Sequence, residues 1–369
     1  MSKKLIIAAI SARGYAEAAY EVTNKQECTF NIVTLDAFAD VDTRKFVTQS
    51  LVVKLGESGV DEDDFKQKFQ QIKIDENCDF IYGSLFDSTP ALLVWLSERV
   101  NVLGNSAKTM QICRSLGFFE LLEDLNIAYP EVQFDAPEQA LDWLTKDFFC
   151  TGGTHVKSAA SLKKGDYFQR KVDGVPVSLL FVADGLSVKV IGFNQQWLAP
   201  TADMPYRFAG AVGGLCFAQH VQQQFVEAAQ KLTASLGLVG VNSLDAILDG
   251  DNLWILELNP RLSATFHLYP NLLQAHLRAC AGELIDLPVV STFKAQLILY
   301  ADKALDVSAD FIWPDCVADM PYAENGIVRI AENEPICTVF AEAQNAIEAQ
   351  RLVLYKTKIL KRELFHDSK

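Results

Sequence analysis

Short hydrophobic runs alternate with longer amphipathic segments through the first hundred residues. The runs are β-strand length and rich in Ile, Leu, Val and Phe, whereas the segments between them repeat apolar side chains at helical spacing. The predicted strands are residues 5–10, 31–35 and 80–82, and the predicted helices are residues 15–22, 63–73 and 90–99. Strands that alternate with helices indicate a parallel sheet, so residues 1–103 are predicted to form a small α/β domain.

After residue 103 the pattern becomes mixed, which predicts an α+β region. Its predicted helices are residues 106–116, 118–125, 137–145, 221–236 and 271–280. Its predicted strands are residues 131–134, 167–172, 177–182, 186–191 and 297–300, the last just beyond it, with a small β-rich subdomain at about 145–192. The Gly- and Pro-rich stretch 196–214 is predicted to be a loop. Residues 291–369 are predicted to form a β-cap with strands at 326–330 and 336–340, closed by a helix at 341–356.

Two apolar runs, 241–248 and 253–258, flank Asp249-Gly250-Asp251-Asn252 and predict a β-hairpin. The strand period of two places four side chains of the second run on one face: Leu253, Ile255, Glu257 and Asn259. Asp245 lies opposite Glu257 if the loop has three residues, 250–252, or if the hairpin carries a bulge. A regular two-residue loop would turn Asp245 to the other face.

This hairpin also carries the first candidate chemistry. Glu257 interrupts an apolar strand, where an unpaired charge is costly. Carboxylate and amide oxygens two residues apart can bind one hard cation, and Arg261 adds a fixed positive charge beside them. We interpret the set as a site for a metal-bound polyphosphate. The alternative is a surface hairpin with charges on its solvated face.

Composition limits the classes of partner. With 369 residues the chain can form two or three domains, and half of the residues are hydrophobic. A net charge of −14 argues against nucleic acid and anionic membranes as partners, although a local cationic pocket can still bind a nucleotide. No apolar run approaches the 18 residues of a membrane span, and Lys3-Lys4 with run 5–10 is interpreted as a buried strand rather than a signal peptide.

The cysteines and histidines give no metal or redox motif. The eight cysteines are scattered without CxxC spacing, which favours thiols in a reducing cytoplasm. His155 and His267 have no partner at ligand spacing, so neither is predicted to bind zinc or to act in catalysis.

A glycine pair gives the second candidate site. Gly152-Gly153 stands between strand-like runs, where its backbone amides can approach phosphates; a plain turn is an equally good interpretation. Lys146, shortly before the pair, can contact the same phosphates.

The order of these features resembles the ATP-grasp superfamily. Lys146, the glycine pair, strand 167–172 and then Asp245 with Glu257-Leu258-Asn259-Pro260-Arg261 follow one another as in that family. The resemblance covers roughly residues 104–290, and the preceding domain looks like the family's pre-ATP-grasp domain. It implies an α/β fold class, α+β in the ligase part: an ATP-grasp fold with an N-terminal parallel α/β domain and a C-terminal β-cap.

The resemblance also implies roles for individual residues. Asp245, Glu257 and Asn259 would hold two Mg²⁺ ions, for which Mn²⁺ can substitute, and Arg261 and Lys146 would act in catalysis. ATP would be bound by Lys146 and by a further set: Gly152, Gly153, Gln169, Arg170, Lys171 and Val172. Two arginines are candidates for substrate binding. Arg207 can bind a carboxylate or form a surface ion pair, and Arg13 can face an interdomain cleft or lie in a solvated turn.

The implied reaction is an ATP-dependent ligation of a carboxylate to an amine through an acyl phosphate. Ser11-Ala12-Arg13, Gly192-Phe193-Asn194 and Tyr206-Arg207 resemble a carboligase-like branch in which glutamate is joined to tyramine in methanofuran synthesis, with methylofuran as a related product. Glutamate with tyramine or tyrosine is therefore the expected substrate pair, and a homodimer is compatible with the family. The alternatives are a carboligase that uses bicarbonate and a non-catalytic nucleotide-binding regulator.

Overall fold

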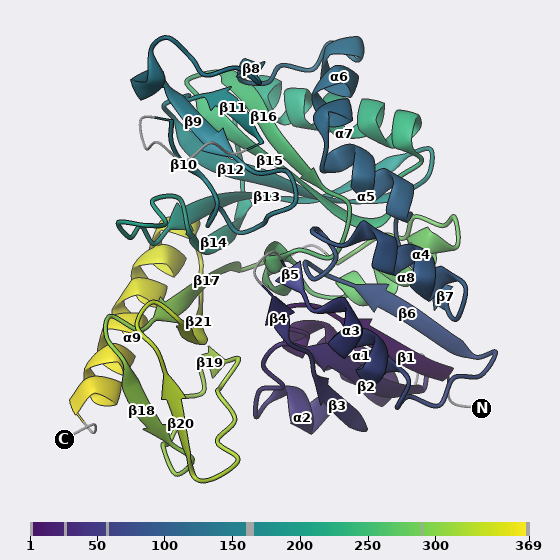
Figure 1. Cartoon of the computed structure of the whole chain (residues 1–369), viewed down its shortest axis with the longest axis vertical. Coiled ribbons are helices and arrows are strands. Elements are labelled where there is room, and N and C mark those ends of the chain that lie inside the picture. Colours follow the sequence, from purple (N-terminus) through teal and green to yellow (C-terminus); the bar gives the residue numbers. More distant parts are fainter. Residues whose placement is uncertain (1–2, 26–27, 57–58, 160–165, 289–290, 367–369) are drawn as a thin grey trace.

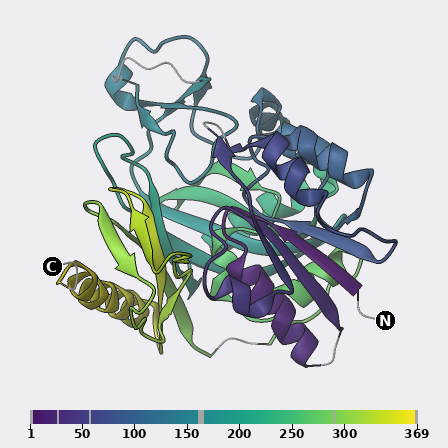
Figure 2. The same ribbon diagram turned by 60° about the horizontal axis from the view of Figure 1, so that its bottom comes forward.

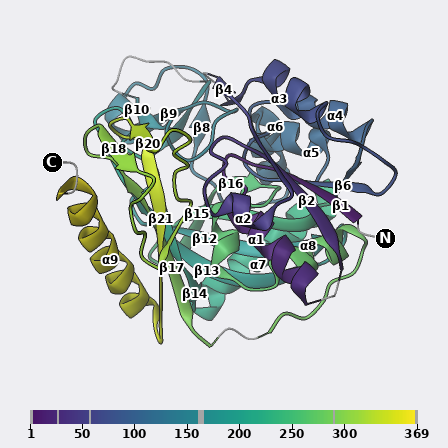
Figure 3. The same cartoon turned by 90° about the horizontal axis from the view of Figure 1, so that it is seen from below.

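The computed structural model describes residues 3–25, 28–56, 59–159, 166–288 and 291–366. Two sheets form the body of the molecule. The N-terminal sheet (purple in Figure 1) lies beside a larger central sheet, and the last helix lies at the far end of the central sheet (Figures 1, 2 and 3).

The N-terminal sheet is parallel, with strand order β3-β2-β1-β6-β7. Its strands are β1 (Lys3–Ala8), β2 (Phe30–Asp36), β3 (Gln49–Val52), β6 (Cys78–Tyr82) and β7 (Asn101–Val102). Its helices are α1 (Arg13–Asn24), α2 (Thr43–Phe46), α3 (Glu62–Phe69) and α4 (Pro90–Ser97), and β4 (Leu55–Gly56) pairs with β5 (Gly59–Val60) beside them. The predicted parallel sheet, with helices between its strands, is therefore confirmed.

Strand β1 shows why its sequence is continuously apolar. Leu5 and Ile7 pack in a core that includes residues of α1, while Ile6 and Ala8 pack in a second core with residues of α3 and α4. All four side chains are fully buried. A parallel strand covered on both faces needs apolar residues at every position, not at every second one.

The central sheet has eight strands in the order β16-β15-β12-β13-β14-β17-β21-β19, paired antiparallel. Their bounds are β12 (Val175–Asp184), β13 (Val188–Leu198), β14 (Phe208–Leu215), β15 (Val239–Asp249), β16 (Asn252–Asn259), β17 (Phe293–Tyr300), β19 (Val317–Ala318) and β21 (Pro335–Ala343). A separate small sheet holds β8 (Val132–Gln133), β9 (Trp143–Lys146), β10 (Lys157–Ser158) and β11 (Tyr167–Arg170).

Helices cover both faces of the central sheet. The remaining helices are α5 (Ala107–Cys113), α6 (Leu116–Asp124), α7 (Gln219–Leu236), α8 (Leu272–Cys280) and α9 (Ala346–His366), with short 3₁₀ turns η1 (Ala140–Asp142) and η2 (Ala264–Leu268). Residues of α6 and α7 pack with β12, β15 and β16 in one core, and α8 packs with α1 in another. The two-stranded sheet of β18 (Leu305–Ser308) and β20 (Ile327–Ile330) lies near α9.

The C-terminal strands continue the central sheet. β17 pairs with β14, so hydrogen bonds of one sheet cross the predicted division at residue 290. Helix α9 covers this end through Ala349, Val353 and Leu360, which join the core of β17 and β21. The division into three domains stays a prediction.

Three predicted elements are wrong. Residues 137–145 form only η1 before β9 begins, because residues 143–146 pair with β11. The predicted loop 196–214 contains the end of β13 and most of β14; a Cβ on Gly210 would lie 2.1 Å from the carbonyl oxygen of Gln296, so this glycine permits a close strand approach. The last helix is α9, since residues 341–343 belong to β21.

One buried amide joins the two sheets. Asn105 Nδ2 lies 2.8 Å from Asn242 Oδ1 and 3.0 Å from the carbonyl oxygen of Pro260, and Asn105 Oδ1 accepts from Val239 N at 2.9 Å. The side-chain cap of α5 is Ser106, whose hydroxyl accepts from Thr109 N at 3.1 Å.

We expect Asn105→Ala to lower the free energy of unfolding by about 2–4 kcal/mol, because several buried polar groups lose their partner together. Urea unfolding measures the change. Ser106→Ala is the matched control and should cost about 1 kcal/mol, the usual loss for a helix cap. If the two variants lost the same free energy of unfolding, Asn105 would not be the residue whose hydrogen bonds join the two sheets.

Candidate functional site

The hairpin of β15 and β16 has a different loop from the one predicted. Asp249 pairs with Asn252, so the loop is the two-residue Gly250-Asp251, and the predicted three-residue loop is wrong. A β-bulge corrects the register: Ala246 pairs with Ile255, whereas Asp245 pairs with Glu257. The predicted alternative of a bulge, which places Asp245 opposite Glu257, is confirmed.

The bulge also resets the alternation of side chains along β16. Leu253, Ile255 and Leu258 are buried in the core that includes α7 residues, so the extra residue, Leu256, shifts the inward positions by one. The prediction that Leu253, Ile255, Glu257 and Asn259 share one face is therefore wrong. Glu257 and Asn259 lie with Asp245 on the opposite face.

On that face three side chains form one polar cluster. Asn259 Nδ2 donates to Asp245 Oδ2 at 3.0 Å and to Glu257 Oε1 at 3.2 Å. Gln196, on β13, donates to Asp245 Oδ1 at 3.1 Å. Asp245, Glu257 and Asn259, separated by up to 14 residues in sequence, thus meet as predicted.

The pKa values of the two carboxyl groups in the cluster are shifted in opposite directions. Burial, together with the negative charge of Glu257, raises the pKa of Asp245 well above its ordinary value. Burial would also raise the pKa of Glu257, but Arg114 and Lys146 hold it below its ordinary value. Two adjacent carboxylates that repel each other in a buried place fit a divalent cation, which would neutralise both.

Asn259 is oriented away from a metal-ligating pose. Its Oδ1 accepts from Arg114 Nη2 at 2.7 Å and from Arg261 Nη2 at 3.0 Å, and its Nδ2 faces the carboxylates. Coordination by Asn259 would require the amide to turn over. Among the described residues no group of three or more His, Cys, Asp and Glu side chains can hold a metal ion; the predicted set has two carboxylates and this amide.

Sequence reasoning missed two members of the site, Asp87 and Arg114. Asp87 Oδ2 accepts from Arg261 Nε at 2.8 Å, and its Oδ1 accepts from Arg114 Nε at 3.0 Å. All three side chains are buried. No sequence signal marks them, because the contacts join positions 27 and 174 residues apart.

Lys146 lies at the end of β9 and is buried. Its Nζ donates to Gln169 Oε1 at 2.6 Å, and burial lowers the pKa of Lys146 to about 8, with Glu257 acting in the opposite direction. Gln169 Nε2 is buried without a hydrogen-bond partner in the described part of the chain. An unsatisfied buried donor beside a lysine fits a nucleotide that would supply the missing acceptor.

The two residues after Gln169 lie at the surface. Arg170 and Lys171 have exposed side chains, which form ion pairs with Asp142 at 3.7 Å and Asp173 at 3.1 Å. Nucleotide binding by Arg170, Lys171 and Val172 stays a prediction.

Hydrogen bonds hold the loop of the glycine pair next to Arg261 and to β14. Thr151 Oγ1 accepts from Arg261 Nη2 at 3.2 Å, and the carbonyl oxygen of Gly152 accepts from Phe208 N at 3.0 Å. Gly153 has φ +70°, and a Cβ there would lie 2.1 Å from the carbonyl oxygen of Tyr206. Gly153 is thus required by close packing, while Gly152, also at φ +70°, faces open space.

The two candidate substrate arginines occupy separate places. Arg207 is buried over the Tyr300 ring, 3.7 Å from its centroid, and donates to carbonyl oxygens of Ala199 and Asn333. Its guanidinium binds backbone, so the predicted surface ion pair is not what forms. A substrate contact of Arg207 stays a prediction.

Arg13 begins α1 and is 5% exposed, so the solvated-turn interpretation is wrong. Its Nε lies 3.0 Å from Asp319 Oδ1, and its Nη1 lies 2.6 Å from Glu17 Oε2. Arg13 thus joins the N-terminal domain to the segment that follows β19. Its Nη2 has no partner among the described residues, which leaves one donor for a ligand.

The two histidines lie close to these groups. Burial lowers the pKa of His155 to about 4, and Glu257, Lys146 and Arg114 are among the charges that act on it. Burial lowers the pKa of His267 to about 3, with Arg13 acting in the same direction. Both rings are therefore neutral near pH 7; the expectation that neither acts in catalysis stays a prediction.

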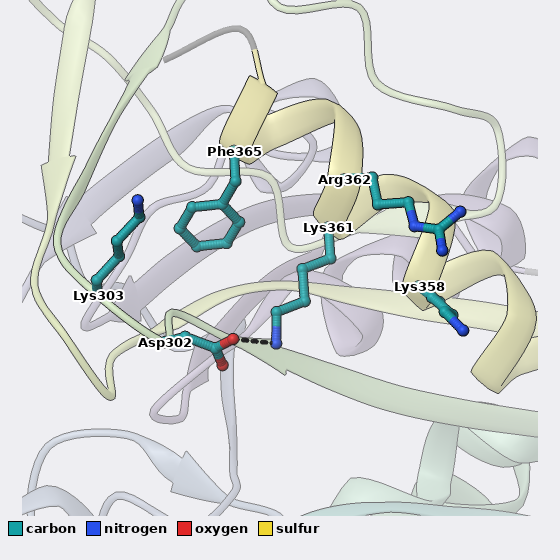
Figure 4. A pocket seen from close by; sticks show the side chains of 6 residues that line it. All are labelled: Asp302, Lys303, Lys358, Lys361, Arg362 and Phe365. Atoms are coloured by element: carbon teal, nitrogen blue, oxygen red, sulfur yellow. Dashed lines mark ion pairs between the residues drawn. The ribbon is translucent and has the colours of Figure 1, made fainter. Parts of the chain in front are cut away.

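A separate hollow of about 450 Å³ lies beside α9 (Figure 4). It is lined by Asp302, Lys303, Lys358, Lys361, Arg362 and Phe365, none of which belongs to the predicted site. Within the described ranges, no helix is long and apolar enough to cross a membrane.

Comparison with known proteins identifies the fold. Residues 116–265 match the model of the ATP-grasp domain. Over 214 residues, 52% of this chain, the sequence is 26% identical to the arginine-specific large chain of carbamoyl phosphate synthase from Bacillus subtilis. The chain spans about a fifth (21%) of that curated relative.

Solved structures match nearly the whole chain. A biotin carboxylase from Campylobacter jejuni has a TM-score of 0.70 at 12% identity, covering 95% of this chain and 89% of its own. The biotin carboxylase domain of a Hydrogenobacter thermophilus 2-oxoglutarate carboxylase, a dimer with MgADP and bicarbonate, has a TM-score of 0.72 at 10% identity, covering 96% and 90%. N5-carboxyaminoimidazole ribonucleotide synthetase from Thermotoga maritima has a TM-score of 0.67 at 12% identity, covering 97% and 98%.

At these identities the structural likeness shows the fold. The predicted fold class is confirmed: the protein has a mixed α/β ATP-grasp fold, with a parallel N-terminal sheet and a large antiparallel sheet. The domain match also supports the prediction that the protein is an enzyme of the ATP-grasp ligase class. ATP and Mg²⁺ are the ligands used by ATP-grasp enzymes, and MgADP is present in the Hydrogenobacter structure.

Because the pKa of Lys146 lies near 8, we expect MgADP to bind more weakly as the pH rises. The ammonium that attracts phosphate is present below pH 8 and lost above it, so affinity should fall by up to about tenfold per pH unit there. Calorimetric titration between pH 7.5 and 9.5 measures the change. Lys146→Gln should bind weakly with no such slope, and a flat wild-type profile would contradict the assignment.

Proposed function

We propose that the protein is an ATP-dependent carboxylate–amine ligase that forms an amide through an acyl phosphate. The observation that carries the proposal is the bulged hairpin, which brings Asp245 and Glu257 side by side next to Asn259 and two buried arginines. Within an ATP-grasp domain, this arrangement suits a metal-bound triphosphate whose γ-phosphoryl group is transferred.

The metal would be held by Asp245 and Glu257, with Asn259 as a third ligand once its amide turns over. Two Mg²⁺ ions, or Mn²⁺ in their place, would neutralise charge on the transferring phosphates when bound. A bound cation would lower the pKa of Asp245, which burial and the negative charge of Glu257 raise above its ordinary value.

Other residues would bind and orient the nucleotide. Lys146 directs its ammonium to a phosphate, and Gln169 offers its unpartnered Nε2 to the base or ribose. Arg261 stabilises negative charge on the phosphoryl group or on the tetrahedral oxyanion. Gly152 and Gly153 cover the phosphates and exclude water, which would otherwise hydrolyse the acyl phosphate.

For the substrates we propose an amino acid as the acid and an amine as the acceptor, with glutamate and tyramine or tyrosine as the specific pair. The product would serve methanofuran or methylofuran synthesis. Arg13, with its free Nη2, is the better-placed arginine for a substrate carboxylate; Arg207 is retained as a second candidate.

A second candidate function is a carboligase that uses bicarbonate. It is favoured by the similarity to biotin carboxylases, one of which has bicarbonate bound. A nucleotide-binding regulator without turnover is the third candidate. The retained carboxylate pair and Arg261 argue against it, because binding alone does not require all of them.

We also propose a cytoplasmic location and a homodimer. All eight cysteines are free thiols, which suits a reducing compartment. The dimer is proposed from the Hydrogenobacter structure. The partners would be small molecules rather than nucleic acid or membranes, as the net charge of −14 suggests.

Glu257→Gln or Asn259→Ala should reduce the rate by roughly two to three orders of magnitude with the fold intact, equivalent to about 3–4 kcal/mol of transition-state stabilisation. ADP release measures the rate, and thermal unfolding checks the fold. Asp251→Asn, in the exposed hairpin loop, is the matched control and should keep wild-type activity. Near wild-type turnover in folded Glu257→Gln protein would refute the metal-site assignment.

The function is tested by ADP release with Mg-ATP against a matrix of amino acids and amines, with mass spectrometry of the products. We expect an Mg²⁺-dependent amide, with glutamyl-tyramine or glutamyl-tyrosine as the specific product. ADP release that needs bicarbonate and no amine would favour the carboligase. Nucleotide binding without turnover under any combination would favour the regulator.

A further inference from the structure

Asp87 stands between two arginines at the boundary between the N-terminal domain and the ATP-grasp domain. It lies in the connection from β6 to α4, and its side chain is 2% exposed. One carboxylate oxygen accepts from Arg261 Nε at 2.8 Å; the other accepts from Arg114 Nε at 3.0 Å and from Arg114 Nη2. One buried carboxylate thus fixes two guanidinium groups.

These contacts decide where the arginine charges lie. With both Nε atoms held by Asp87, the two Nη2 atoms converge on Asn259 Oδ1, at 2.7 Å from Arg114 and 3.0 Å from Arg261. Further bonds to the carbonyl oxygens of Leu258 and Leu262 hold the guanidiniums in place. In the described residues neither arginine forms an ion pair with Asp245 or Glu257, although Arg114 is near enough to lower the pKa of Glu257.

The arrangement has an electrostatic consequence. Without Asp87, two buried guanidiniums would lose their charged partner. Arg114 already acts on the pKa of Glu257, and Arg261 on that of Asp245. A buried cation without a partner is costly, so the arginines would turn toward those two carboxylates. An arginine paired with either carboxylate competes directly with a divalent cation for the same oxygens.

We propose that Asp87 is a positioning residue that reserves the Asp245–Glu257 pair for a divalent cation by holding Arg114 and Arg261 away from it. The inference rests on the proposed function only in taking that pair as the metal site. It also gives the N-terminal domain a part in the phosphate site, since Asp87 is supplied from outside the ATP-grasp domain.

The test is Mn²⁺ binding in the presence of ADP, followed by electron paramagnetic resonance. Asp87→Asn keeps the shape of the side chain but presents an amide donor to one guanidinium, which releases it. We expect the Mn²⁺ dissociation constant to rise roughly tenfold or more, and the Mg²⁺ concentration for half-maximal ADP release to rise in parallel. At saturating Mg²⁺ the rate should recover most of its wild-type value, which a general loss of structure would not allow.

Two further variants separate positioning from stability. Asp79→Asn is the matched control: Asp79 is a buried carboxylate of the same domain, paired with Lys3 and Asn101, and its loss should lower thermal stability without changing Mn²⁺ affinity. Arg114→Lys keeps the positive charge but gives up the two-nitrogen grip on Asp87, so it should weaken Mn²⁺ binding as well. It serves as the test if Asp87→Asn does not fold.

Unchanged Mn²⁺ affinity in folded Asp87→Asn, or in folded Arg114→Lys, would overturn the inference. Failure of the proposed function is distinguishable from this outcome, because Mn²⁺ binding with ADP is measured without an acid, an amine or turnover. If the wild-type protein binds Mn²⁺ and ADP but forms no product, the ligase proposal fails while the role of Asp87 is still decided.

Discussion

Charged side chains are buried between the N-terminal domain and the central sheet, and the free-energy cost of burying them constrains how these two parts pack together. Asp87, Arg114, Arg261, Asp245 and Glu257 are ionisable groups held in one partly dehydrated region. Such groups are tolerated only when each has a partner, so their hydrogen bonds fix the relative positions of the elements that carry them. The site and the joint between the domains are therefore built from the same interactions.

Asn259 is the central member of this network. Its amide oxygen accepts from two guanidiniums and its amide nitrogen donates to two carboxylates, so one neutral side chain separates the positive and the negative halves of the site. A carboxylate at this position would attract the arginines and repel Asp245 and Glu257. The orientation of the amide therefore reflects the charges around it, and a bound cation would change that balance.

The sequence predicted the fold class and the main site for clear physical reasons. The apolar run of β1 and the hairpin pattern around Gly250 are local signals, and the parallel N-terminal sheet and the β15–β16 hairpin follow from them. The prediction failed where pairing with distant strands overrides local preference. Residues 143–146 join a sheet through β11, and Gly210 lies in a strand because Gln296 approaches it closely.

By itself the sequence determined that two carboxylates and an amide belong to one hairpin and that an arginine follows it directly, because the hairpin signal is local. Only the tertiary structure decided which face they occupy, since that depends on a bulge at Leu256 whose inward neighbours pack on α7. Only the tertiary structure, too, brought Asp87 and Arg114 to the site. Contacts between residues far apart in the chain arise from the packing of whole elements, and no short-range pattern encodes them.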